Sequence, residues 1–192
     1  MKKDIILCGV GGQGILSIAT IIGQAATKAG LNLKQAEVHG MSQRGGDVQS
    51  NLRLSTDEIH SDLIPTGKAD LIISMEPMES LRYLPYLAGD GRIVTSSKPL
   101  VNIPNYPDET ALFEEIEKLG CVSMANIEEM AQTEHLPKSA NMILLGMAAA
   151  FISIIAAEDL REAVKVVFAS KGEAVVEANL KAFDLGLNIV KS

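Results

Sequence analysis

The chain has few cysteines, aromatic residues and basic residues for its length. Its 192 residues include two cysteines, three histidines, no tryptophan and only 4% aromatic residues. Its 17 basic side chains stand against 24 acidic ones, which gives a formal net charge of −7. Proteins that bind nucleic acids present a basic face and aromatic platforms for the bases. The composition therefore argues against a nucleic-acid partner and favours small molecules or proteins as partners.

The two cysteines, Cys8 and Cys121, lie in separate apolar runs and form no C-x-x-C pair. Iron–sulfur clusters are usually held by four thiolates, so this chain cannot hold one by itself. Isolated thiols in apolar runs are typical of small core residues in a reducing compartment, and we expect a cytoplasmic protein. The three histidines have no ligand spacing, which argues against a metal site.

The sequence also lacks a convincing membrane span, and no apolar leader precedes its first predicted strand. The most apolar run, 142–155, is about as long as a short span, but Ser139 and Asn141 precede it and Glu158 follows it closely. We interpret this run as a buried or subunit-facing helix. An apolar face left exposed on it would make the isolated chain self-associate.

A glycine-rich turn close to the start is the strongest motif that the chain does contain. The apolar run 5–7 is typical of a strand buried on both faces, and it leads into Gly9, Gly11 and Gly14 with G-x-G-x-x-G spacing. Helical periodicity resumes directly afterwards. The N–H groups and dipole of that helix would favour an anion above the turn, near Gln13.

Three interpretations of this turn differ in their chemistry. A phosphate-binding P-loop needs Lys and then Ser or Thr after the last glycine, and Ile15 and Leu16 stand there instead. A dinucleotide site would use Glu37, about 20 residues further on, to bind a ribose. A turn that serves only tight packing is the third interpretation, and it stays open beside the second.

A second polar cluster occupies residues 37–46. Its side chains comprise an acid, an imidazole, a hydroxyl, an amide and a guanidinium, from Glu37, His39, Ser42, Gln43 and Arg44. In a parallel sheet this loop would follow the second strand at the same edge as the glycine turn, where such folds bind ligands. The loop could equally be solvated without function. No serine or cysteine has a base beside it, and we predict no catalytic residue in this chain.

Predicted strands and helices alternate as far as residue 126, and only helices follow. After the first strand, strands are predicted at 31–38, 48–55, 69–75, 92–96 and 120–125. Helices are predicted at 15–29, 78–87, 109–119, 127–133, 140–157, 158–169 and 172–190. The motif Gly89-Asp90-Gly91 is interpreted as a turn, because the asparagine pair of a thiamine-binding motif does not follow it.

This alternation predicts an α/β fold: a Rossmann-like, mostly parallel sheet flanked by helices, with a C-terminal helical appendage. We expect a single domain, 1–192, with an α/β core at 1–126 and a helical tail at 127–192. The strand at 48–55 follows the second strand directly, which is unusual in a plain doubly wound fold.

The two glycine loops together carry a resemblance to a known family. The segments Gly-Val-Gly-Gly-Gln-Gly (9–14) and Glu-Val-His-Gly-Met-Ser-Gln-Arg-Gly-Gly (37–46) resemble the gamma-type subunits and domains of 2-oxoacid:ferredoxin oxidoreductases. The resemblance is greatest to the small (beta) subunits of indolepyruvate ferredoxin oxidoreductases. It continues through 48–55 and through 69–77, which ends in Glu76-Pro77.

The resemblance implies an accessory subunit. The complete enzyme would oxidatively decarboxylate indolepyruvate or another aryl pyruvate to an acyl-CoA and reduce ferredoxin. Thiamine diphosphate and iron–sulfur clusters would lie on a larger partner subunit, and this chain alone would be inactive. Related domains are implicated in coenzyme A access. The candidate residues carried over are Gly11, Gly12, Gln13, Gly14, His39, Gln43, Arg44 and Gly46, with Glu37 added by the dinucleotide alternative.

Within this resemblance, Arg44 would make a forked contact to a phosphate or to a partner carboxylate. Asp47 departs from the pattern, because related domains more often carry a small residue there. Two other functions stay open: a free-standing NAD-binding oxidoreductase that uses Gly9, Gly11, Gly14 and Glu37, and a purely structural subunit that uses both loops as a contact surface.

Overall fold

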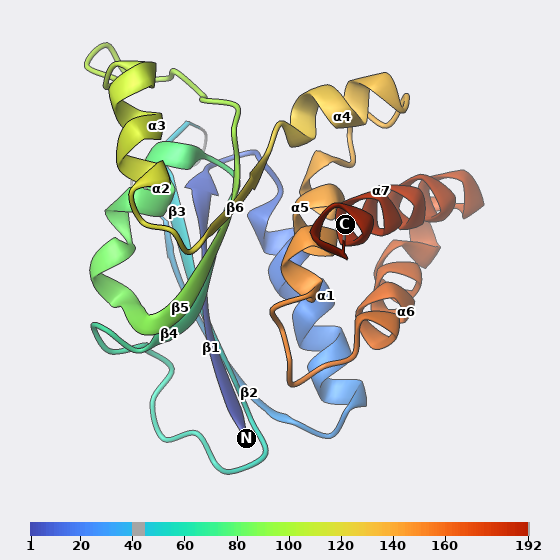
Figure 1. The fold of residues 1–192 in the computed structure, drawn as a ribbon. Coiled ribbons are helices and arrows are strands. Elements are labelled where there is room, and N and C mark those ends of the chain that lie inside the picture. Colours follow the sequence, from blue (N-terminus) through green and yellow to red (C-terminus); the bar gives the residue numbers. More distant parts are fainter. Residues whose placement is uncertain (40–44, 192) are drawn as a thin grey trace.

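A six-stranded sheet with helices on both faces forms the body of the computed structural model (Figure 1). The structure describes residues 1–39 and 45–191. The strand order is β2-β3-β1-β4-β5-β6. The strands are β1 (Lys2–Val10), β2 (Asn32–His39), β3 (Asp47–Ser55), β4 (Ala69–Ser74), β5 (Leu87–Ser96) and β6 (Val122–Ala125).

The helices form one layer on each face of the sheet. They are α1 (Ile15–Lys28), α2 (Pro77–Arg82), α3 (Glu109–Glu117), α4 (Ile127–Thr133), α5 (Ala140–Ala149), α6 (Ala157–Phe168) and α7 (Glu173–Lys191), with 3-10 turns η1 (Leu84–Tyr86) and η2 (Ala169–Lys171). In Figure 1, α2 and α3 lie on one side of the sheet, and α1, α5, α6 and α7 lie on the other.

The central strand β1 is apolar throughout because both of its faces are covered. Ile5 and Leu7 belong to the large core shared with α1, α5, α6 and α7, whereas Ile6 and Cys8 belong to a smaller core under η1. All four side chains have no exposed surface. A continuous apolar run is therefore what this position requires.

The sheet is mostly parallel, which confirms the predicted fold class. Strands β1, β4, β5 and β6 are parallel neighbours. Strand β3, the unusual strand at 48–55, runs antiparallel between β1 and β2. Because β3 is antiparallel to both neighbours, β1 and β2 point the same way, and their carboxyl ends lie at the same edge as predicted.

Two predicted element boundaries are wrong. The helix expected at 78–87 ends at Arg82 and is followed by η1, because Pro85 offers no backbone N–H and disfavours a helical conformation at the residue before it. The Gly89-Asp90-Gly91 turn lies inside β5: Leu87 pairs with Ala69, and pairing resumes at Arg92 opposite Leu71, so the intervening residues form a bulge.

The interpretation of the run 142–155 as a buried helix is confirmed, and the prediction of an exposed apolar face that would make the isolated chain self-associate is wrong. Helix α5 ends at Ala149 instead of residue 157, and Met142 through Ala149 are at most 5% exposed. Ile152 and Ile155, in the turn that follows, are buried as well. The run is apolar because the other helices and the sheet enclose it. Across residues 1–39 and 45–191, the structure contains no helix with the length and apolarity needed to cross a membrane.

Helices α5 and α7 pack closely because each contributes a glycine to their contact. A Cβ added at Gly146 would overlap the carbonyl oxygen of Phe183 and lie 2.9 Å from the nitrogen of Leu187. A Cβ added at Gly186 would overlap the carbonyl oxygen of Ile143. Backbones of the two helices therefore touch, which fixes where α5 begins and ends relative to the sheet.

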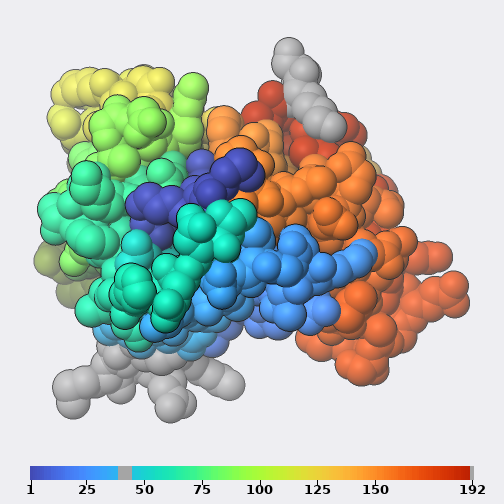
Figure 2. Space-filling view, turned by 90° about the horizontal axis from the view of Figure 1, so that it is seen from below, coloured from blue at the N-terminus to red at the C-terminus, as the bar shows by residue number. Residues whose placement is uncertain are grey.

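An ion pair joins β1 to β3 near the N-terminus of the chain, whose first residues are dark blue in the surface view of Figure 2. Asp4 is 1% exposed, and Arg53 donates to it from Nε (2.8 Å) and from Nη2 (3.2 Å). The Arg53 Nη1 donates to the carbonyl oxygens of Ser61 and Leu63. This arginine thus attaches the segment after β3 to β1.

Candidate functional site

The glycine turn is joined to the start of β3 by two backbone hydrogen bonds. Gly11 N–H donates to the carbonyl of Gly46 (2.8 Å), and Gly45 N–H donates to the carbonyl of Gly11 (3.3 Å). The two glycine loops predicted from the sequence therefore meet at one edge of the sheet. Absence of side chains at these positions permits this close approach of two backbones.

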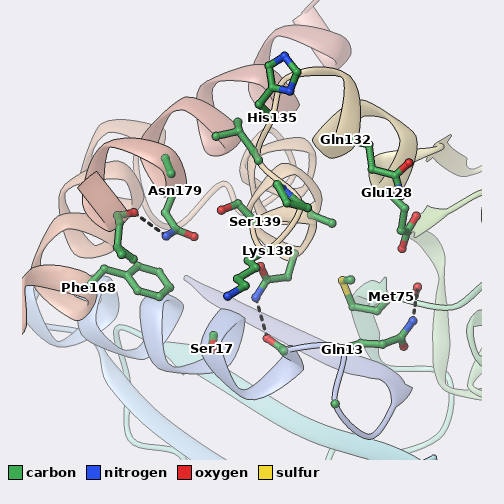
Figure 3. Close-up of a pocket in the computed structure, with 18 of the residues that line it drawn as sticks. Gln13, Ser17, Met75, Glu128, Gln132, His135, Lys138, Ser139, Phe168 and Asn179 are labelled. Atoms are coloured by element: carbon green, nitrogen blue, oxygen red, sulfur yellow. Dashed lines mark hydrogen bonds between the residues drawn. The ribbon is translucent and has the colours of Figure 1, made fainter. Parts of the chain in front are cut away.

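The Gln13 side chain holds the turn in place. Its Oε1 accepts from Val10 N–H (2.8 Å), and its Nε2 donates to the carbonyl of Met75 (3.2 Å), as Figure 3 shows. Gln13 thereby connects the end of β1 to the end of β4. Both the donor and the acceptor of the amide are used, so the role of this residue here is to position the turn.

The last glycine of the motif begins helix α1 and contacts the tail. Gly14 is the N-cap residue with φ of 84°, a left-handed conformation that favours glycine. Its carbonyl accepts from Asn141 Nδ2 (3.1 Å), and a Cβ at this position would lie 2.6 Å from that nitrogen. The start of α5 is therefore packed against the start of α1.

A cavity of about 1040 Å³ opens beside this contact, between the sheet edge and the helical tail (Figure 3). Gly12, Gln13 and Gly14 form one wall, and the connection after β5 forms another. Ser17 of α1 and Met75 after β4 also line it, and the rest of the lining comes from the tail: Glu128, Gln132, His135, Leu136, Pro137, Lys138, Ser139, Ala140, Asn141, Phe168, Lys171, Ala174, Val175, Ala178 and Asn179. Its size is that of a site for a sizeable small molecule.

The lining of the cavity is basic although the chain is acidic overall. Lys98, Lys138 and Lys171 line it, and Glu128 is the only carboxylate among the described lining residues. Ser96 Oγ donates to Glu128 Oε2 (2.6 Å). Burial raises the pKa of the Glu128 carboxyl, and the Ser96 hydrogen bond opposes this shift. The site is thus suited to an anion.

The candidate residues predicted from the sequence fall into three groups. Gly12, Gln13 and Gly14 line the cavity, and Gly11 and Gly46 form the backbone link beside it. Glu37 and His39 lie on β2. The predictions for Gln43 and Arg44 lie outside the described residues.

Strand β3 separates Glu37 from the glycine turn. Glu37 is paired with Ser50 of β3, and its carboxylate accepts from Gln35 Nε2 (2.6 Å). Neighbouring strands are about 4.8 Å apart, so β2 lies roughly 10 Å from β1. In a dinucleotide-binding fold the ribose-binding acid ends the strand next to β1. The inserted strand removes Glu37 from that position, and the dinucleotide interpretation loses its acid.

Asp47 is explained by a contact on the other face of the sheet. Tyr83 hydroxyl donates to both carboxylate oxygens of Asp47 (2.9 and 3.1 Å). Burial and the Asp47 carboxylate raise the pKa of Tyr83, which keeps its proton available for this contact. Nearby, burial raises the pKa of Glu79, and the Arg82 guanidinium opposes the shift. Asp47 therefore anchors the start of β3 to the segment after α2.

The buried Glu76, which the sequence analysis names only as the end of the resembling segment 69–77, anchors the connection after β5. Glu76 has no exposed surface and caps α2 by accepting from Glu79 N–H (2.9 Å). It also accepts from Leu100 N–H (3.3 Å) and from the Tyr106 hydroxyl. These contacts hold the connection after β5, which carries Lys98, against the sheet.

The tail residues of the cavity were also missed, because the tail was predicted as an appendage. The one signal in the sequence is the segment Pro137-Lys138-Ser139, which starts an apolar helix without any acidic residue in its first turn. Among the described residues, no group of three or more His, Cys, Asp or Glu side chains could hold a metal ion.

The fold and the joined glycine loops define an α/β domain of Rossmann type. The chain belongs to the pyruvate ferredoxin/flavodoxin oxidoreductase family, whose model matches residues 4–189. It is 37% identical to the indolepyruvate oxidoreductase subunit IorB of Methanothermobacter thermautotrophicus over 191 residues, covering 95% of each chain. It is 36% identical to the subunit of the same name from Pyrococcus horikoshii, covering 100% of this chain and 98% of the relative.

Solved structures share the fold. The gamma subunit of a keto/oxoacid ferredoxin oxidoreductase from Geobacter sulfurreducens has a TM-score of 0.70 and 24% identity, with 98% of each chain covered. The 2-oxoglutarate:ferredoxin oxidoreductase of Magnetococcus marinus, solved with coenzyme A bound, has a TM-score of 0.76 and 23% identity. The match covers 99% of this chain and 31% of that one.

Proposed function

We propose that this chain is the small subunit of an indolepyruvate:ferredoxin oxidoreductase, which converts an aryl pyruvate to an acyl-CoA and reduces ferredoxin. The observation that carries this proposal is the full-length similarity, 33–37% identity, to four indolepyruvate oxidoreductase subunits. The hydrogen bonds between the two glycine loops support it, because the two sequence segments that carry the resemblance meet at the same edge of the sheet.

In this proposal a larger subunit carries thiamine diphosphate and the iron–sulfur clusters. The two cysteines of this chain, Cys8 and Cys121, are too few to bind a cluster. A related ketoisovalerate oxidoreductase subunit, 27% identical, contains a matching region that makes up 35% of its length. That relative supports the idea that such a domain works together with further domains. Unpaired cysteines are in keeping with a cytoplasmic complex.

We further propose that the edge beside the glycine turn contacts coenzyme A. Gly12, Gln13 and Gly14 present the start of α1 to the cavity, where the helix dipole favours a phosphate. Gly11 and Gly46 join the glycine turn to the start of β3 beside it, and we carry Gln43 and Arg44 over from the resemblance alone. The coenzyme A bound in the Magnetococcus enzyme supports the choice of ligand. Glu37 and His39, on β2, lie at the margin of this contact.

Co-purification from the native cell tests the subunit assignment. We expect a large, cysteine-rich chain to accompany this one, and the complex to reduce a dye with indolepyruvate only when coenzyme A is present. Recovery of this chain alone, together with saturable binding of NAD by the pure chain, would contradict the assignment and favour a free-standing oxidoreductase.

Arg44→Ala tests the coenzyme A contact separately. Loss of a charge-assisted hydrogen bond costs about 1.5–3 kcal/mol, so the KM for coenzyme A should rise about ten- to a hundredfold while the complex still assembles. Arg44→Lys should rescue little if the contact is forked. Weaker assembly with an unchanged KM would instead favour a purely structural role for the loop.

A further inference from the structure

We propose that the start of α5 forms a second anion subsite in the cavity, made by Ser139, Lys138 and the free backbone N–H groups of Ala140 and Asn141. Together with the start of α1, it would bind a ligand that carries two anionic groups close together, such as an organic bisphosphate. This inference deepens the proposed coenzyme A contact and rests on it, since coenzyme A carries a diphosphate and a separate 3′-phosphate.

The Ser139 side chain is the observation that points to a ligand. Ser139 is 4% exposed, lines the cavity and occupies the N-cap position of α5, yet it makes no capping hydrogen bond. Its hydroxyl makes no hydrogen bond within residues 1–39 and 45–191, and because no buried side-chain oxygen of these residues lacks a partner, the hydroxyl must reach the surface of the cavity. By contrast, α2, α3 and α4 are capped by the side chains of Glu76, Asp108 and Asn126. A hydroxyl without a protein partner at the wall of a cavity is available to donate to, or accept from, a bound ligand or water.

The charge pattern of the helix starts separates α1 and α5 from the other helices. Helices α2, α3, α4, α6 and α7 each carry at least one acidic residue in the first turn, which complements the positive end of the helix dipole. Helices α1 and α5 carry none, and neither has a side-chain cap. The starts of both helices line the cavity, through Gly14 and Ser17 for α1 and through Ala140 and Asn141 for α5, whereas α4 and α7, whose first turns also reach it, carry their own acidic residues. A bound anion would supply the negative charge that the first turns of α1 and α5 lack.

Lysines surround the two helix starts. Lys138 directly precedes Ser139, and Lys98 lines the cavity from the end of β5 (Figure 3 labels Lys138 and Ser139). In the part of the chain that the structure describes, neither ammonium forms an ion pair with a carboxylate. Lys98 also interacts with the Glu128 carboxylate and opposes the rise of its pKa, whereas Lys138 has no such partner among the described residues and adds attraction for a phosphate beyond that of the backbone N–H groups.

The two starts are also close enough to serve one small ligand. Asn141, in the first turn of α5, donates to the carbonyl of Gly14 at 3.1 Å. Anionic groups bound at the two helix starts must therefore lie close together, as two phosphates on one ribose do. Phe168, Val175 and other apolar residues of the lining offer the remaining surface to the uncharged part of such a ligand.

Calorimetric binding of adenosine 3′,5′-bisphosphate and of 5′-AMP to the two-subunit complex tests this subsite. The parent complex should bind the bisphosphate about tenfold or more tightly than 5′-AMP, because the second phosphate gains charge-assisted contacts. Lys138→Ala should remove most of this preference, and Ser139→Ala should reduce it. Glu128→Gln should tighten binding, because it removes the only described carboxylate of the lining. Lys118→Ala is the control, because that lysine pairs with Glu115 on α3, away from the cavity.

Equal affinities of the parent for the two ligands, or equal effects of Lys138→Ala and Lys118→Ala, would overturn the subsite. Circular dichroism and thermal unfolding of each complex verify that the variants keep the helix content and stability of the parent. Activity separates this inference from the proposed function. Bisphosphate binding that depends on Lys138, in a complex without coenzyme A-dependent turnover, would support the subsite and contradict the proposed function. Coenzyme A-dependent turnover without such binding would support the proposed function and overturn the subsite.

Discussion

Gly146→Ala should destabilise the chain, although alanine is the better helix former. In the middle of a helix the substitution by itself gains about 1 kcal/mol. At Gly146, however, the new methyl group would meet the backbone of α7 at Phe183 and Leu187, closer than the 3.0 Å that real Cβ atoms keep. Backbone atoms cannot rotate away as a side chain does, so α5 and α7 must move apart.

The magnitude follows from that separation. A shift of about 1 Å removes a quarter to a half of the dispersion energy of every atom pair across the contact. Overpacked cores lose about 1–3 kcal/mol and occasionally more. After the helix-propensity gain, we expect a net loss of about 2 kcal/mol in the free energy of unfolding. For a chain of this length, that corresponds to a fall in Tm of about 4–8 °C.

Urea and thermal unfolding followed by circular dichroism measure this loss. The matched control is Gly23→Ala in α1, where the new Cβ would meet only Leu33 Cδ2 at 3.3 Å, the end of a flexible side chain. That variant should keep or raise stability by up to about 1 kcal/mol. A Gly146→Ala variant as stable as Gly23→Ala would refute the reasoning about the helix contact.

Three further predictions address the sheet, the cavity and the isolated chain. Arg53→Ala should lower the free energy of unfolding by about 3 kcal/mol, because Asp4, 1% exposed, would keep only Lys2 as a cationic partner among the described residues. A loss below about 1 kcal/mol in urea titration would contradict this. The raised pKa of Glu128 means that the folded state binds more protons, so this group lowers stability as pH rises above about 4.5. Glu128→Gln should therefore unfold at higher urea than the parent at pH 7 and at the same urea below pH 4, whereas a difference that grows on acidification would exclude this origin. The isolated chain should be colourless and should reduce no dye with indolepyruvate; turnover that follows this chain through purification would show that it holds an active site of its own.

The sequence predicts those parts of the fold that depend on residues close together in the chain. Apolar runs of the right length predict β1 and β4, because both faces of a central strand are buried. The glycine spacing at 9–14 predicts the turn, because Gly14 must adopt a positive φ to begin α1. The shared edge of the two glycine loops was predicted from strand direction, and the Gly11–Gly46 hydrogen bond confirms it.

The parts that escaped prediction depend on partners distant in the sequence. The Gly89–Gly91 bulge arises from pairing with β4, and the sequence around it reads as a turn. Asp47 accepts a hydrogen bond from Tyr83, 36 residues away, and this contact explains its position. The cavity exists because Asn141 meets Gly14 across 127 residues, so the tail that was predicted as an appendage supplies most of its lining. A contact between residues so far apart in the sequence cannot be predicted from a local sequence pattern.

Reconstitution with the larger subunit, scored by steady-state kinetics, tests the central claim most directly. The purified large subunit alone, and this chain alone, should show little indolepyruvate-dependent reduction of ferredoxin, and the mixture should recover activity that saturates with coenzyme A. The double variant Arg44→Ala, Lys138→Ala should assemble normally and require at least a hundredfold more coenzyme A, at about tenfold for each lost contact. A large subunit that reaches full activity by itself, with the same KM for coenzyme A whether or not this chain is present, would contradict the account.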